Sequence, residues 1–81
     1  MIYHLEVISS ASHVPIGDVL GKILAAANVH CATSDDIAEA VYAFVLHGIG
    51  LQESIDRVSK MFDDGYQMDA ILWSLYHHSS P

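Results

Sequence analysis

Six histidines and one cysteine are the residues of this 81-residue sequence whose side chains most often bind zinc in proteins. They are His4, His13, His30, His47, His77, His78 and Cys31. Zinc sites bring three or four such ligands together, commonly with a spacing such as His-x3-His that places two of them on one face of a helix. No such pair occurs, and adjacent residues such as His77 and His78 diverge by about 100° on a helix. We therefore predict no metal and no cofactor, and keep a site built from Cys31, His47 and His77 as an alternative.

The same side chains give little support for catalysis. A nucleophile needs a general base within hydrogen-bonding reach, and Cys31 beside His30 is the one candidate that is local in the sequence. A single cysteine in an apolar region more often contributes to packing than to chemistry. No glycine-rich phosphate loop is present, and no pair of carboxylates sits where burial would raise one pKa. We predict that the chain is not an enzyme and has no catalytic residues.

The charge of the chain argues against two classes of partner. Ten acidic residues and three basic ones give a formal net charge of −7. Nucleic-acid-binding proteins supply clustered Lys and Arg for phosphates, and anionic membrane surfaces attract the same residues. We therefore predict no binding to nucleic acid or membrane. The adjacent acidic pairs at 35–36 and 63–64 lie near expected helix ends, so we interpret them as solvated helix ends, with DNA mimicry as a remote alternative.

The size and composition predict a single small domain over residues 1–81 that self-associates. A chain this short buries only about 60% of the surface that its unfolded form exposes. Hydrophobic residues make up 52% of the sequence and charged residues 16%, which is more apolar surface than a small globule easily hides. We therefore expect a homodimer. The N-terminus lacks a basic signal region and no apolar stretch reaches about 20 residues, so we expect a cytoplasmic protein.

The hydrophobic pattern predicts an all-α, or nearly all-α, fold: a compact bundle of about four short helices after a short N-terminal strand or arm. The predicted helices cover residues 15–28, 34–47, 51–64 and 66–78, with Pro15 at the start of the first and Gly48 and Gly65 after the second and third. In residues 1–9, three apolar side chains alternate with polar ones, namely Tyr3, Leu5 and Val7. This alternation is typical of a strand. Because a lone strand leaves its edges unpaired, the segment needs a partner, is the first turn of a helix, or is a loose arm.

A bundle of this size could also be a helix-turn-helix domain. Its recognition helix would be residues 66–78, which contain no Arg or Lys and carry Asp69 in the first turn, where phosphates would lie. We therefore expect no DNA-binding function even if the fold is related.

Two of the expected helices carry more apolar surface than one buried face needs. Residues 40–46 are seven apolar residues in succession, a pattern typical of a helix that is surrounded on all sides. We predict that a second chain supplies part of this surrounding, with a dimer interface at Val41, Tyr42, Phe44 and Val45.

The last expected helix, 66–78, has two apolar stripes. One contains Met68, Ile71, Leu72 and Leu75, and the other contains Tyr66, Ala70, Trp73 and His77. Trp and Tyr are the residues most enriched at binding hot spots. We predict that the second stripe binds a partner protein together with the N-terminal arm, through Tyr66, Ala70, Trp73, His77, Tyr3, Leu5 and Val7. The alternative is that both stripes belong to the core.

These observations predict a small acidic protein–protein interaction module that binds and modulates another protein, by inhibiting or adapting it. In size, acidity and lack of catalytic signals, the chain is similar in type to small inhibitory or adaptor proteins, including those carried by phages and other mobile elements. The alternative hypotheses are a small metal-binding protein that uses Cys31 and histidines and, more remotely, a DNA-mimic inhibitor.

Overall fold

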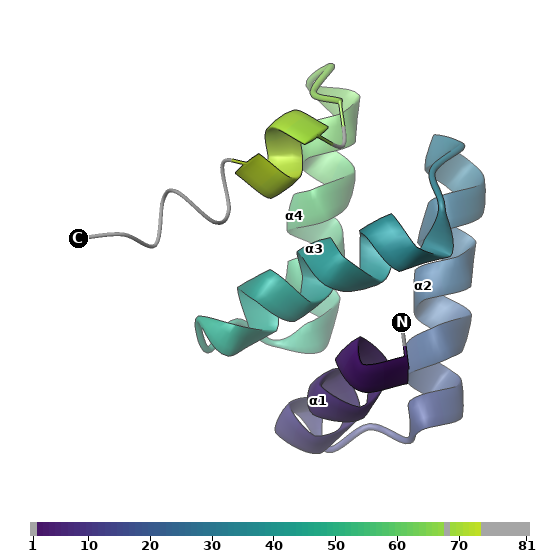
Figure 1. The fold of residues 1–81 in the computed structure, drawn as a ribbon, viewed down its shortest axis with the longest axis vertical. Helices are drawn as coiled ribbons and strands as arrows, with labels where there is room; N and C mark the ends of the chain where they lie inside the picture. Colours follow the sequence, from purple (N-terminus) through teal and green to yellow (C-terminus); the bar gives the residue numbers. More distant parts are fainter. Residues whose placement is uncertain (1, 68, 74–81) are drawn as a thin grey trace.

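The computed structural model describes residues 2–67 and 69–73. It contains four helices, α1 (Ile2–Ser12), α2 (Ile16–His30), α3 (Ser34–Leu46) and α4 (Leu51–Asp63), followed by a helical turn at residues 69–73 (Figure 1). The described part of the chain contains no strand. The predicted all-α bundle is therefore confirmed. Within these residues, none of the helices combines the length and the hydrophobicity needed to cross a lipid bilayer.

The N-terminal segment differs from its prediction, because Ile2–Ser12 is a helix and not a strand. Leu5 and Ile8 are its buried residues, and their i, i+3 spacing places both on one helical face. A helix pairs its own backbone N–H and C=O groups, so the segment needs no second strand. After α1 ends at Ser12, the chain turns, and the Ser9 hydroxyl donates a 2.6 Å hydrogen bond to the Val14 carbonyl oxygen across this turn.

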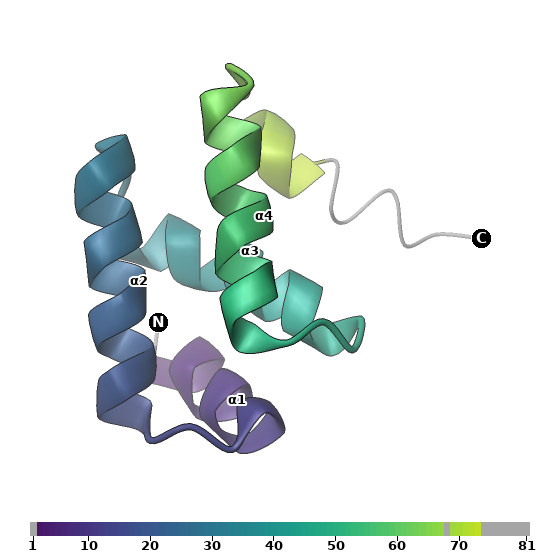
Figure 2. The ribbon, with the colours of Figure 1, turned by 180° about the vertical axis from the view of Figure 1, so that it is seen from behind.

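The four helices form two layers. α2 and α4 lie side by side in one layer and run in the same direction, and α1, α3 and residues 69–73 form the other layer (Figures 1 and 2). Two contacts fix the parallel pairing. Lys22, in the middle of α2, donates a 3.1 Å hydrogen bond from its ammonium group to Gln52 Oε1 in the first turn of α4. Near the ends of both helices, the rings of His30 and Phe62 stack with centroids 4.8 Å apart.

The core is centred on α3, which contacts α1, α2 and α4. Three neighbouring helices of the same chain thus bury four residues of the apolar run at 40–46, whereas Tyr42 and Phe44 are half-buried and Leu46 is 59% exposed. Val41 and Val45 are buried within this core, so the prediction that they form a dimer interface is wrong. The largest side chains with no exposed surface come from every helix and from the last turn: Ile8, Val19, Ile23, Ile37, Val41, Val58 and Ile71.

Local signals explain where the helices begin and end. The Thr33 hydroxyl accepts a 3.2 Å hydrogen bond from the Asp36 N–H and so caps α3. α2 continues past the predicted end at Asn28 to His30, and Cys31 follows it in the left-handed conformation at φ 54°. Gly48 and Gly65 follow α3 and α4 at φ 83° and 91°, a conformation that glycine adopts without a steric penalty.

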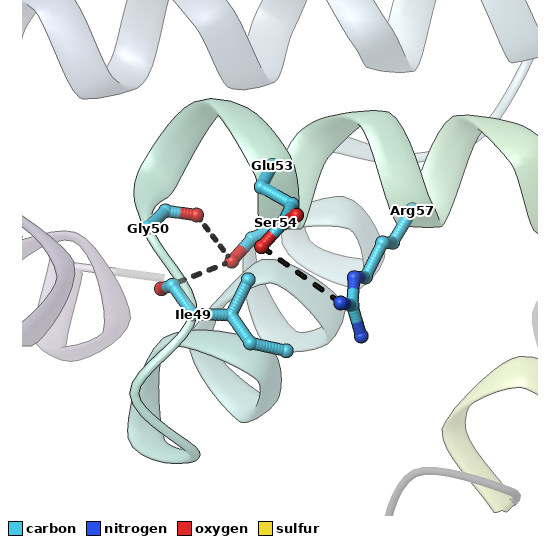
Figure 3. Close-up of polar contacts among 5 residues, drawn as sticks. All are labelled: Ile49, Gly50, Glu53, Ser54 and Arg57. Carbon is cyan, nitrogen blue, oxygen red and sulfur yellow. Dashed lines mark hydrogen bonds and ion pairs between the residues drawn. The ribbon is translucent and has the colours of Figure 1, made fainter.

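α4 begins without a side-chain cap at Gly50. Instead, the buried Ser54 hydroxyl turns back to the carbonyl oxygens of Gly50 and Ile49, at 2.7 and 3.3 Å (Figure 3). On the solvent side of the same turn, Arg57 and Glu53 form an exposed ion pair at 3.8 Å (Figure 3). The first turn of α4 is therefore held by the buried Ser54 hydroxyl, while the outer face of the helix is polar.

Candidate functional site

The first candidate is the C-terminal aromatic surface, which we define as Tyr66, Ala70 and Trp73. All three side chains are exposed, and Trp73 keeps 63% of its surface accessible. Two residues earlier, Ile71 has no exposed surface. The helical turn at 69–73 is thus anchored in the core through one side and presents aromatic surface on the other. His77, the fourth residue predicted for this surface, lies outside the described residues.

The second candidate is the α1–α3 aromatic cluster, which we define as Tyr3, His4 and Tyr42. The ring of Tyr42 lies 5.8 Å from that of Tyr3 and 4.7 Å from that of His4, measured between centroids, and Tyr3 and His4 are 5.9 Å apart. The ring planes meet at 47° to 65°, the tilted and edge-to-face arrangements that aromatic pairs prefer. Tyr3 had been assigned to a partner-binding arm and Tyr42 to a dimer interface, but the structure places them in one cluster.

The polar groups of this cluster differ in their hydrogen bonding: the Tyr42 hydroxyl has a partner, whereas His4 Nδ1 has none. A hydrogen bond with the Tyr3 side chain raises the pKa of the Tyr42 hydroxyl above its ordinary value of 10.0, and desolvation and the nearby Tyr3 charge act in the same direction. His4 Nδ1 is buried and has no hydrogen-bond partner. Sequence reasoning did not select His4 for this site, since the ring reaches Tyr42 only because α1 is a helix packed on α3.

The other residues predicted for partner or dimer contacts lie deeper in the molecule. Leu5 is buried in the core, so the prediction that it contacts a partner is wrong; it faces inward because the segment is a helix. Val7 and Phe44 are half-buried. The Phe44 ring lies beneath the Arg57 guanidinium, 6.0 Å from its carbon to the ring centroid, at the outer limit for a cation–π contact.

The surface hollows between described residues include the following two. One, of about 290 Å³, lies between α2 and α4, with Ala25, Val29 and Ile55 among its lining residues. The other, of about 320 Å³, is lined by Phe44, Arg57, Lys60, Met61 and Asp64. Both have volumes at the lower limit for small-molecule sites, and the lining of the first also includes Lys22, His30 and Ser59.

The metal alternative depended on Cys31 and the histidines. Cys31 is exposed at the end of α2 with a free thiol. Within residues 2–67 and 69–73, no three His, Cys, Asp or Glu side chains are grouped so that they could share a metal ion. His77, one of the proposed ligands, lies outside these residues.

Comparison of the chain with protein-family models, curated proteins and solved structures finds no match.

Proposed function

We propose that this chain is a protein–protein interaction module, which binds another protein through the C-terminal aromatic surface and thereby inhibits or adapts it. The observation that carries the proposal is the contrast between Trp73, which is 63% exposed, and Ile71, which is fully buried. An anchored turn holds its exposed side chains in place, so a partner need not order them on binding, and that lowers the entropic cost of association.

The chemistry of Trp and Tyr suits this role. Their large rings contribute much apolar area while having few rotatable bonds, and the indole N–H and phenol O–H provide hydrogen bonds at the edge of a contact. Residues of these types dominate the free energy of many interfaces. Ala70 lies between them in the sequence and is exposed as well, and its small side chain leaves room for a partner side chain to approach.

The net charge of −7 supports a partner with a basic surface. Charge complementarity accelerates the encounter of two proteins and disfavours partners of like sign. Because such attraction is long-ranged and screened by salt, it would raise the association rate more than it fixes the bound orientation. The aromatic surface would fix the orientation.

The experiment uses the full chain as bait, with Trp73→Ala and Tyr66→Ala as test variants and Val29→Ala as the matched control, since Val29 is also an exposed apolar residue but lies on α2. Partners are captured from cells of the source organism and identified by mass spectrometry. Binding of the purified partner is then measured by calorimetry, with the mass of the bait determined by light scattering. We expect Trp73→Ala to weaken binding by about 10- to 100-fold, while Val29→Ala binds like the parent chain.

Two results would contradict the proposal. One is a partner that binds the Trp73→Ala and Tyr66→Ala variants as tightly as the parent chain. The other is a loss of about 3 to 5 kcal/mol in unfolding free energy on Trp73→Ala, which is the cost expected for a buried Trp and would place this residue in the core.

A further inference from the structure

We propose that the α1–α3 aromatic cluster is a second interaction surface, which binds a lysine- or arginine-bearing segment of a partner protein. The proposal concerns a different part of the molecule from the C-terminal aromatic surface and does not require that surface to function.

The geometry of the cluster suits a cationic side chain. Tyr3 is 62% exposed, and Tyr42 is half-buried beside it with the two ring planes inclined at 60°. Rings at this inclination do not lie flat against each other, so the exposed Tyr3 ring keeps much of its surface accessible. A Lys ammonium or an Arg guanidinium within about 6 Å of such rings is attracted by their quadrupoles. A tyrosine hydroxyl group can also accept a hydrogen bond from a cation.

The net charge differs between the two layers in a way that favours the same ligand, because α2 and α4 offset their four acidic residues with three basic ones. The three basic residues of the chain, Lys22, Arg57 and Lys60, all lie on α2 and α4. α1 and α3 contain no Lys or Arg and carry four acidic residues, Glu6, Asp35, Asp36 and Glu39. A cation that approaches the layer formed by α1 and α3 therefore meets a negative potential.

Helical spacing places two of these acidic residues next to the cluster. Glu39 precedes Tyr42 by three residues on α3, and Glu6 follows Tyr3 by three residues on α1, so each pair lies on one side of its helix. A carboxylate near an aromatic ring stabilises a cation held against that ring. The occupant that fits is a basic segment, because an acidic segment, or a second copy of this acidic layer, would be repelled.

The test is a nuclear magnetic resonance titration of the ¹⁵N-labelled full chain with two synthetic decapeptides, one alternating Lys and Gly and the other alternating Glu and Gly. We expect the lysine peptide to shift the resonances of Tyr3, His4 and Tyr42 more than those of the rest of the chain, and the glutamate peptide to leave them in place. Tyr3→Leu and Glu39→Gln should each weaken binding of the lysine peptide by about threefold. This is the size expected from losing one exposed cation–π or charge contact.

Matched variants on other surfaces separate a local site from diffuse attraction. Val29→Ala removes an exposed apolar side chain on α2, outside both proposed surfaces, and Glu53→Gln removes an acidic residue on α4. Both variants should bind the lysine peptide like the parent chain. The proposal is overturned if Glu53→Gln weakens binding as much as Glu39→Gln, or if the shifts spread evenly over the acidic residues of all helices. It is also overturned if light scattering shows a dimer that Tyr3→Leu dissociates, since the occupant is then a second copy. Circular dichroism verifies that each variant is folded.

Discussion

α3 and α4 are both 13 residues long, but they occupy different positions in the bundle. α3 buries six residues, contacts all three other helices and contains no Lys or Arg. α4 buries four residues, and its outer face carries the exposed ion pairs Glu53–Arg57 and Lys60–Asp64. α3 occupies the centre of the molecule, while α4 is a surface helix.

The difference shows what an apolar helix in a small domain requires. The run at 40–46 suggested a second chain, because 81 residues were expected to supply too few neighbours. α1, α2 and α4 pack around α3 and bury four of these seven residues, whereas Leu46 stays 59% exposed. An apolar run in a helix thus indicates contact with several neighbouring helices, even where part of the run stays at the surface.

The largest effect that would test this comparison comes from matched truncations in the two helices. Ile37 on α3 has no exposed surface, whereas Ile55 on α4 is 8% exposed and lines the hollow between α2 and α4. We expect Ile37→Ala to lower the free energy of unfolding by about 4 kcal/mol and Ile55→Ala by about 2 kcal/mol, because cavity cost depends on how completely neighbours surround the site. Urea denaturation followed by circular dichroism measures both values.

If Ile37→Ala fails to fold, the pair Ile37→Val and Ile55→Val gives the same comparison with costs of about 0.5 to 1.5 kcal/mol each. Equal losses in the two helices would show that α3 is no more central than α4.

A smaller effect on the free energy of unfolding is expected from the first turns of α3 and α4, which are stabilised by different hydrogen bonds. Thr33→Ala removes the side chain that caps α3 and should cost about 1 kcal/mol, whereas Thr33→Ser keeps the hydroxyl and should cost much less. Ser54→Ala should cost about 0.5 kcal/mol, because the Gly50 carbonyl oxygen still accepts a 2.8 Å hydrogen bond from the Ser54 N–H. Thermal unfolding of the three variants ranks them. A larger loss for Ser54→Ala than for Thr33→Ala would show that the buried Ser54 hydroxyl contributes more to stability than the Thr33 cap.

The Tyr3→Phe variant on α1 tests the partly exposed side of α3, where Tyr42 lies against Tyr3. This change removes the hydrogen bond that is the main cause of the raised Tyr42 pKa, so the pKa should fall toward 10.0. A raised pKa means that the folded state keeps this proton longer than the unfolded state. Its contribution to stability is therefore present below about pH 10 and is lost as the pH rises above that value. Ultraviolet titration of tyrosine ionisation measures the shift, and an unchanged Tyr42 pKa would show that the Tyr3 hydroxyl has no role.

The smallest effect is expected on the outer face of α4. Both partners of the Glu53–Arg57 ion pair are more than half exposed and lie 3.8 Å apart, so Glu53→Gln should change the free energy of unfolding by less than about 0.5 kcal/mol. Denaturation at low and high salt provides the measurement. A loss of more than about 1 kcal/mol that disappears in high salt would mean that electrostatics on α4 contribute more than its position suggests.

Most of the helix boundaries could be predicted from the sequence because the local signals are strong. Pro15, Thr33, Gly48 and Gly65 each act within one turn of the chain. The N-terminal strand was predicted wrongly because the alternation of Tyr3, Leu5 and Val7 covers too few residues to distinguish period 2 from the i, i+3 spacing of Leu5 and Ile8. The backbone favoured the helix, which satisfies its own hydrogen bonds.

The candidate surfaces could be predicted only in part. The sequence shows that residues 66–78 carry two apolar stripes. Which stripe packs inward depends on where the helical turn at 69–73 meets the core, and the full burial of Ile71 identifies the inward stripe. Tyr3 and Tyr42 are far apart in the sequence, and no local pattern links them. Their contact depends on the packing of α1 against α3, which is a property of the whole fold.

Because α2 and α4 run parallel, a tight hairpin cannot bring them together, and α3 must first carry the chain back to the end where α2 begins (Figures 1 and 2). The contact between Lys22 and Gln52 spans 30 residues, so it forms only after the entropic cost of closing that loop has been met. We therefore expect α3 to be docked in the folding transition state and the contacts between α2 and α4 to form later. In stopped-flow experiments, Ile37→Val should then slow folding, whereas Ile55→Val should mainly accelerate unfolding.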